Sequence, residues 1–284
     1  MRRRALAGLA LAVAGVAGAA GRDAAWYVQV DNDVVFTTDR WYTSGVRIAR
    51  LERDFEWGLV QEIYTPDAKN PRPVDRAPAG RLLASVAHHD RSAEVWCTLE
   101  AALGVRGPAA LGRQSTDYIH RLIPAPAVDW SRQLENRLDA QLAFTRSEIL
   151  GLGLVKAHYG AVLGTQRAFA HAGIEIRAGA NRSMASALLR FAPTPPLALQ
   201  SAPGWNAYAG ASGRAVGRDE LVSRNYNPFG PPLSRRNAIG RLVAGVAWTQ
   251  PWGTLTFEIA QDSREFDGQH APHRFGSLAF HLDF

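Results

Sequence analysis

Hydrophobic and polar residues alternate with a period of two over most of the chain. In residues 277–284, four large apolar side chains alternate with Ser, Ala, His and Asp, and residues 254–260 repeat the pattern. A period of two places successive side chains on opposite faces of a strand, whereas a helix repeats every 3.6 residues. The alternation predicts about twelve strands, near residues 26–31, 42–52, 55–64, 80–88, 93–104, 137–147, 150–163, 168–179, 204–215, 239–250, 252–262 and 272–284.

The connections between these strands alternate between short and long. Short turns fall at residues 53–54, 89–93 and 250–252, and long loops at 65–79, 105–136 and 216–238. Bacterial outer-membrane barrels have an even number of strands, short periplasmic turns and long outer loops, and closure pairs every backbone amide. Phe284 closes the last alternating strand with an aromatic residue, while the long segment 181–203 falls where a short turn is expected.

The fold class that follows is all-β: a closed antiparallel transmembrane β-barrel of about 12 strands. A soluble β-sandwich or barrel is the competing fold, because alternation alone does not say which face meets solvent.

The N-terminus carries the pattern of a secretory signal peptide. Arg2, Arg3 and Arg4 precede a short apolar run at residues 5–16, and Ala17-Gly18-Ala19 supplies the small residues of a cleavage site. We assign residues 1–20 to the signal peptide and residues 21–284 to one barrel domain. After residue 20 no apolar run reaches the length of about 18 residues that a membrane-spanning helix requires.

Charge and cysteine content narrow the function classes. The formal net charge is +6, three of these charges lie in the signal segment, and the only lysines are Lys69 and Lys156. Without a clustered basic stripe we expect no nucleic-acid partner, whereas scattered arginines suit lipid or sugar phosphates. Cys97 is the single cysteine, which excludes an internal disulfide and a four-cysteine zinc site. We expect a monomer in the outer membrane.

Oxygen-bearing side chains gather where the first strand ends. Asp31, Asn32 and Asp33 close that strand, and residues 38–45 follow after a short loop. Carboxylate and amide oxygens suit a hard cation such as calcium. The spacing is not that of an EF-hand, because Phe36 stands where glycine is required and Tyr42 where glutamate is. A turn held by local Asn and Asp hydrogen bonds is the alternative.

The loop at residues 105–136 contains the histidine best placed for catalysis. Residues 114–123 lack strand alternation and predict a short helix before Pro124. His120 is the only one of the eight histidines on a long loop with carboxamide and acidic groups nearby. Imidazole takes up a proton near neutral pH and is the commonest general base, although an isolated histidine is more often structural.

Several of these motifs together resemble the lipid A 3′-O-deacylase (LpxR) family. The likeness covers nearly all of the mature chain, and the order and spacing of the motifs make it specific. The segments that carry it are Asp31–Asp33, Asp39–Gly45, Ile63–Pro66 with Asp75-Arg76, Gly107–Gln114, His120–Ile123, Trp130–Asn136, Ser263–Phe266 and Arg274–Gly276.

The resemblance implies a twelve-stranded outer-membrane barrel that hydrolyses the 3′-linked acyl ester of lipid A with Ca²⁺. Its site would lie at the outer rim, facing the outer leaflet, between the barrel wall and a loop helix. By this resemblance Asn32 and Asp33 hold or position calcium, Thr43 lines the site, and His120 is the general base that activates water. Lipid A or lipopolysaccharide is the expected substrate.

The same resemblance leads us to expect substrate contacts from four further residues, namely Lys69, Arg40, Arg76 and Gln114. Lys69 lies near the position of a functional lysine in the loop after Tyr64-Thr65-Pro66. A family glutamate shortly after the histidine is absent here, where residues 124–128 read Pro-Ala-Pro-Ala-Val.

Two other function classes remain open at this point. One is an outer-membrane phospholipase-type hydrolase with a serine nucleophile, for which Ser44 is the candidate. The other is a non-catalytic barrel or small pore filled by inward-facing charges, namely Arg47, Glu56, Glu100, Glu175, Arg177 and Glu258.

Overall fold

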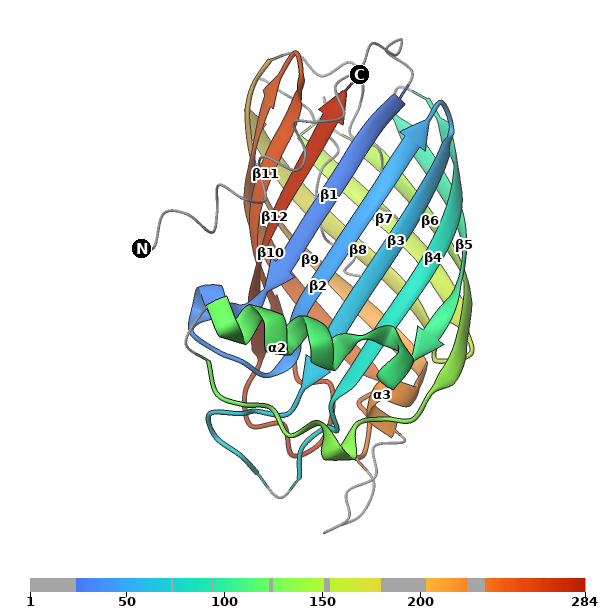
Figure 1. Cartoon of the computed structure of the whole chain (residues 1–284). Helices are drawn as coiled ribbons and strands as arrows, with labels where there is room; N and C mark the ends of the chain where they lie inside the picture. Colours follow the sequence, from blue (N-terminus) through green and yellow to red (C-terminus); the bar gives the residue numbers. More distant parts are fainter. Residues whose placement is uncertain are drawn as a thin grey trace.

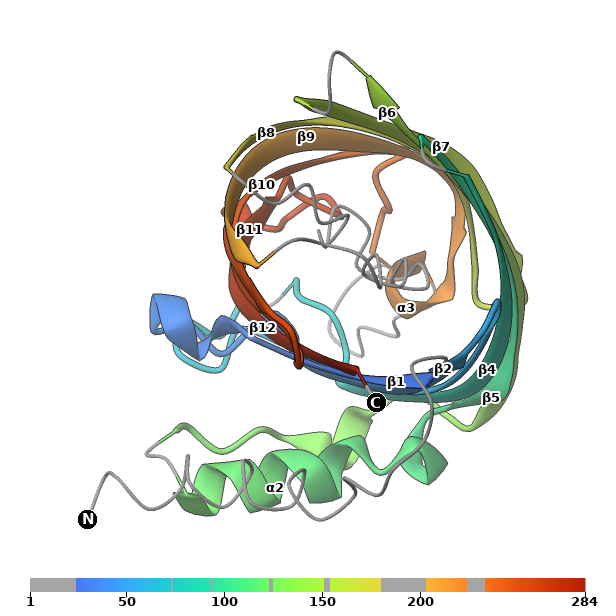
Figure 2. The ribbon, with the colours of Figure 1, turned by 90° about the horizontal axis from the view of Figure 1, so that it is seen from above.

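Twelve antiparallel strands close into one barrel (Figures 1 and 2). The computed structural model describes residues 24–72, 74–92, 94–122, 125–150, 154–179, 203–223 and 233–283. Each strand pairs with its neighbours in the chain, and β1 pairs with β12 to close the barrel. The strands are β1 (Ala24–Asn32), β2 (Trp41–Glu52), β3 (Phe55–Thr65), β4 (Ala79–Arg91), β5 (Val95–Arg106), β6 (Arg137–Leu150), β7 (Val155–Gly164), β8 (Arg167–Gly179), β9 (Gly204–Asp219), β10 (Ala238–Gln250), β11 (Gly253–Asp262) and β12 (His273–Asp283).

The twelve predicted strands are thereby confirmed. The largest difference in bounds is at the strand predicted for residues 150–163, because Leu150 ends β6 and β7 begins at Val155. Three predictions lie outside the described residues: the signal peptide at 1–20, the closing aromatic Phe284, and the long segment at 181–203 except for its last residue.

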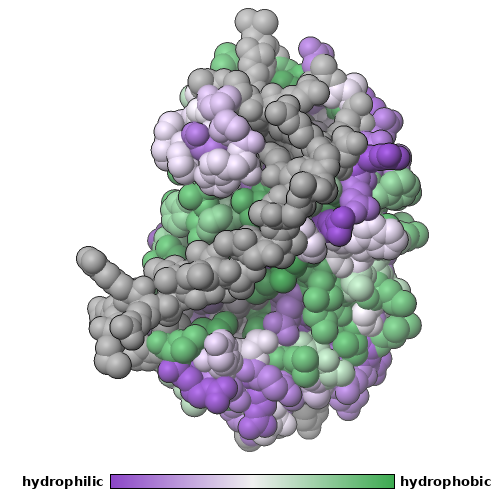
Figure 3. Space-filling view, turned by 45° about the horizontal axis from the view of Figure 1, so that its top comes forward, coloured by the Kyte–Doolittle hydropathy of each residue, from purple (hydrophilic) through white to green (hydrophobic). Residues whose placement is uncertain are grey.

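The two faces of each strand differ in polarity, with charged side chains inside and apolar side chains outside. On β3, Phe55, Trp57 and Leu59 are about half exposed, while Glu56 between them is buried. In Figure 3 hydrophobic surface lies along the visible wall, between a hydrophilic lower end and further hydrophilic patches toward the top. An apolar exterior around a polar interior is the arrangement of a membrane barrel and the reverse of a soluble one.

Buried charges pair with one another across the interior of the barrel. Arg81 contacts Glu62 and Asp139, each at 2.6 Å, and Arg47 pairs with Glu56 and with Glu100. The six inward charges expected from the sequence are all buried. Because a buried charge is costly without a partner, these ion pairs explain how the described strands fill the barrel with polar side chains.

The long loops among the described residues gather at the end of the barrel opposite the start of β1 and the end of β12. The loop after β1 contains η2 (Asp33–Phe36), and the loop after β5 contains η3 (Pro108–Ala110), α2 (Gly112–Leu122) and η4 (Trp130–Arg132). Figures 1 and 2 show α2 lying outside the wall and crossing β1 to β4, while α3 (Glu220–Ser223) lies within the barrel outline.

The predicted loop helix is therefore confirmed, and no helix among the described residues is both long and apolar enough to cross a membrane. One connection at this end is short, because only Thr165 and Gln166 join β7 to β8.

Candidate active site

A cleft between α2 and the outer wall collects most of the residues that the sequence singles out. It encloses about 470 Å³, part of it open to solvent. Its polar lining consists of Asn32, Asp33, Thr38, Asp39, Thr43, Ser44, Lys69, Thr116 and His120. Its apolar lining consists of Val34, Ile63, Ile119, Ala125 and Pro126.

Asn32 and Asp33 bring their side chains to the cleft where β1 passes into η2. Oδ1 of Asn32 accepts a hydrogen bond from Val34 N at 2.7 Å and so caps η2. Oδ2 of Asp33 accepts from Thr38 Oγ1 at 2.8 Å and from Arg40 N at 2.9 Å. Burial raises the pKa of Asp33 to about 7, and the nearby charge of Asp39 adds to the shift.

Asp39 and His120 face each other across the cleft. Oδ2 of Asp39 lies 3.5 Å from Nε2 of His120, a contact longer than a good hydrogen bond. Both carboxylate oxygens of Asp39 are buried and accept no hydrogen bond from the described residues. Burial raises the pKa of Asp39, and the positive charges of His120 and Lys69 oppose this shift. The pair forms a buried acid beside a base that is open to the cleft.

Thr43 enters the cleft through an irregularity in β2. The pairing of β2 with β3 shifts between Tyr42 and Ser44, so Thr43 is the extra residue of a β-bulge. Bulges redirect a side chain and are frequent beside active sites. The hydroxyl of Thr43 is buried and hydrogen-bonded to that of Thr65, and Tyr42 is fixed below it by packing on Tyr64 and Phe275.

Lys69 reaches the cleft from the loop that follows β3. Its Nζ donates a hydrogen bond to the carbonyl oxygen of Thr37, and Asp67 holds the backbone of this loop by accepting from the amides of Lys69 and Asn70. The ammonium group lies close enough to the buried carboxylate of Asp39 to oppose the rise of its pKa. The structure thus brings Asn32, Asp33, Thr43, Lys69 and His120 to one place.

The other three residues expected to bind substrate do not line this cleft. Nη1 of Arg40 contacts Asp67 at 3.0 Å and His270 at 2.9 Å, and its guanidinium stacks on Trp41. Gln114 is exposed on α2.

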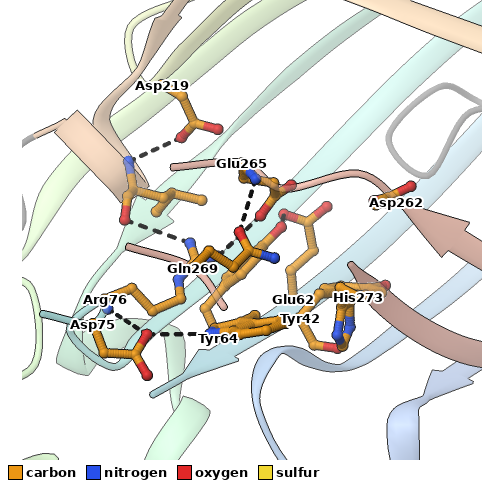
Figure 4. A network of polar contacts seen from close by, with 12 residues as sticks. Tyr42, Glu62, Tyr64, Asp75, Arg76, Asp219, Asp262, Glu265, Gln269 and His273 are labelled. Atoms are coloured by element: carbon orange, nitrogen blue, oxygen red, sulfur yellow. Dashed lines mark hydrogen bonds and ion pairs between the residues drawn. The ribbon is translucent and has the colours of Figure 1, made fainter. Parts of the chain in front are cut away.

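Arg76 is buried in a polar network at the barrel mouth (Figure 4). Its guanidinium contacts Glu265 at 3.3 Å and stacks on Tyr64, which fixes the loop after β3. The positions of Arg40 and Arg76 favour structural roles at the rim over direct contact with a ligand in the cleft.

The donor set at the cleft fits a hard cation. Asp33 and Asp39 are two buried carboxylates close enough to raise the pKa of Asp33, and the oxygens of Asp39 are unsatisfied. A carbonyl oxygen has two lone pairs, so Asn32 can cap η2 and still face a cation.

No group of three His, Cys, Asp or Glu side chains among the described residues is arranged to hold a metal. Further ligands would have to be hydroxyls, backbone carbonyls or water, which calcium accepts and zinc does not favour.

Comparison with known proteins identifies the family and supports the fold. The family model described as "Outer membrane protein LpxR" matches residues 5–284. The chain belongs to the LpxR family. Among solved structures, LpxR from Salmonella typhimurium is similar with a TM-score of 0.76 and 17% identity, covering 92% of this chain and 100% of that one.

The structure of CdiB from Acinetobacter baumannii is much less similar, with a TM-score of 0.33 and 8% identity over 92% of this chain and 60% of that one. No curated protein sequence matches this chain. Because the family match spans nearly the whole chain and the barrel is closed, this LpxR-family chain is an outer-membrane β-barrel.

Two features of this LpxR-family cleft were not predicted from the sequence. Thr116 and Ile119 line it beside His120, which helical spacing could have shown, because residues three or four apart share a face. The contact of Asp39 with His120 joins positions 81 residues apart and has no local signal in the sequence.

Proposed function

We propose that this protein is an outer-membrane deacylase that hydrolyses the 3′-linked acyl ester of lipid A, with His120 as the general base. The observation that carries the proposal is the contact of His120 with the buried Asp39, in a cleft that also holds Asp33 and Thr43 on the outer wall. Membership of the LpxR family supports it. The cleft lies at the end of the barrel where the long loops gather, which is the outer side of such barrels.

In this proposal the two nitrogens of His120 have different tasks. Nε2 faces the carboxylate of Asp39 at 3.5 Å, and the proposal places the ring proton of the neutral imidazole on this nitrogen. Nδ1 then has the lone pair and takes the proton from a water molecule in the cleft. Asp39 stabilises the imidazolium that results, as a buried carboxylate does for other catalytic histidines.

The reaction balances without a covalent intermediate on the protein. The oxygen of the water attacks the ester carbonyl while Nδ1 of His120 accepts its proton. The bond from the carbonyl carbon to the sugar oxygen then breaks, and His120 returns the proton to that oxygen. The products are a fatty acid and a free sugar hydroxyl.

Asn32 and Asp33 would hold calcium in this proposal. When bound there, calcium would supply the positive charge that favours a polarised ester carbonyl and an oxyanion. Lys69 adds a second positive group on the same side of the cleft. Thr43 holds the wall of the site through its hydrogen bond with Thr65, and Val34, Ile63 and Ile119 offer apolar surface to the acyl chain.

The proposal is tested with purified barrel and lipid A in mixed micelles. Release of free fatty acid by the wild-type protein, with no release by His120→Ala, supports it. A glycerophospholipid in the same micelles separates this reaction from that of a phospholipase. Release of fatty acid from the glycerophospholipid but not from lipid A would refute the assigned substrate.

A further inference from the structure

A single polar side chain interrupts the apolar outer face of β3. Phe55, Trp57 and Leu59 take successive outward positions on this strand, and Gln61 takes the next. The register continues from Gln61 through an apolar row on the three following strands, namely Leu82, Val105 and Leu138. A carboxamide that is partly buried in an apolar row is unfavourable unless it is hydrogen-bonded.

Gln61 uses both ends of its carboxamide to hold the start of α2. Its Nε2 donates to the carbonyl oxygen of Ala110 at 2.7 Å, and its Oε1 accepts from Ser115 Oγ at 2.9 Å. Ala110 ends η3, and Ser115 lies in the first turn of α2. One side chain of the wall therefore fixes both the approach to the helix and its first turn.

Two glycines let the helix touch the wall at the same place. A Cβ on Gly112 would lie 3.0 Å from Cα of Gly80, and one on Gly80 would lie 3.1 Å from N of Gly112. Gly107, with φ of +110°, donates its N–H to Gly80 O at 2.9 Å and so brings the chain back to β4. The N-terminal turn of α2 is thus held against β3 and β4.

The catalytic end of α2 has far fewer polar attachments. Within the part of the chain that the structure describes, the only other polar contact from α2 to the rest of the protein is that of His120 with Asp39. His120 follows Ser115 by five residues, roughly 7–8 Å along the helix axis. A change of tilt at the first turn therefore displaces the imidazole relative to Asp39.

We propose that Gln61 is a positioning residue, which holds α2 at the distance from the wall that places His120 against Asp39. This inference rests on the proposed role of His120 as general base. Gln61 touches neither the cleft nor the reacting atoms, and it acts only through the helix.

Gln61→Met tests the proposal, because methionine has a similar length, lacks both hydrogen-bonding groups and suits a lipid-facing position. We expect a folded, heat-modifiable barrel in which kcat falls roughly 10–100-fold and KM changes less than about threefold. In a His120→Ala background, Gln61→Met should cause no further loss, since it acts through that side chain. Leu59→Met, two positions earlier on the same face, is the control and should leave kcat unchanged.

A spin label tests the attachment of the helix without reference to activity. With Cys97 replaced by serine, a nitroxide at Arg121→Cys on the exposed last turn of α2 should show a restricted spectrum, and adding Gln61→Met should make it more mobile.

Three outcomes would show whether the inference about Gln61 or the proposed function is wrong. Unchanged kcat and an unchanged spectrum in Gln61→Met would overturn the inference, and so would an equal loss of activity in the presence and absence of His120. If His120→Ala keeps full activity, the proposed function fails instead, while the spectrum still shows whether Gln61 holds α2.

Discussion

The carboxylate of Asp39 lies 3.5 Å from Nε2 of His120, and its two buried oxygens accept no hydrogen bond from the described residues. A buried, unsatisfied carboxylate is costly, and here it lies beside the histidine that we propose as general base, which would become positively charged in that role. The same arrangement that destabilises the resting site therefore favours the charged state of the base.

Replacement of Asp39 by asparagine should slow hydrolysis without unfolding the barrel. The amide keeps the size of the side chain but cannot stabilise an imidazolium, so we expect kcat to fall roughly 10–100-fold. Asp117→Asn on the exposed face of α2, where Asp117 pairs with Arg113, is the matched control. Equal rates for Asp39→Asn and wild type would show that His120 works without this partner.

Removal of His120 should cost the most activity of any single change in the cleft. His120→Ala should reduce kcat by roughly 10²–10⁴-fold, the usual contribution of a positioned general base. His120→Gln should be no better, because its amide cannot take the proton. Both variants should still migrate faster on gels unheated than boiled, and His158→Gln inside the barrel serves as control. Normal turnover in folded His120→Ala would leave Asp33 or Asp39 as the next candidate base.

Calcium dependence should vary with pH in a direction set by Asp33. Burial raises the pKa of Asp33 from 3.8 to about 7 in the metal-free protein, so below pH 7 a proton must leave before the carboxylate binds a cation. The calcium concentration for half-maximal activity should therefore rise as the pH falls from 8 to 6. Excess chelator should abolish activity, and calcium should restore it better than zinc.

The calcium-free barrel should become less stable as the pH rises. A carboxyl group whose pKa is raised by folding stabilises the folded state at low pH and loses that contribution as the pH rises through the raised value. In chelator, the Tm should therefore fall between pH 5 and pH 8, and Asp33→Asn should reduce this slope. Full hydrolysis in excess chelator would exclude the cation from the mechanism.

Ser44 distinguishes water activation from a serine nucleophile. Its side chain is buried in the lining of the cleft, but no hydrogen bond joins it to His120 among the described residues. We expect Ser44→Ala to retain at least a third of wild-type kcat and the protein to resist serine-directed covalent probes. Stoichiometric labelling of Ser44 together with loss of turnover would support the phospholipase-type alternative.

The barrel could be predicted from the sequence because each strand is specified by the alternation of polar and apolar residues within it. Alternation along each strand is visible in stretches such as residues 254–260, and closure then fixes the neighbours of every strand. Arg76 shows the limit of the motifs, because its burial against Glu265 depends on a loop 189 residues away. Gln61 can be recognised in the sequence as a polar residue in an apolar row. Its role could not be predicted, because it depends on where the loop helix packs.

The most direct test of the proposed deacylation is mass spectrometry of lipid A from cells that carry wild-type protein, His120→Ala or no protein. We expect that only the wild-type protein removes one acyl unit, and that fragmentation places the loss at the 3′ position. An unchanged lipid A profile with folded wild-type protein in the outer membrane, or the same loss with His120→Ala, would contradict it.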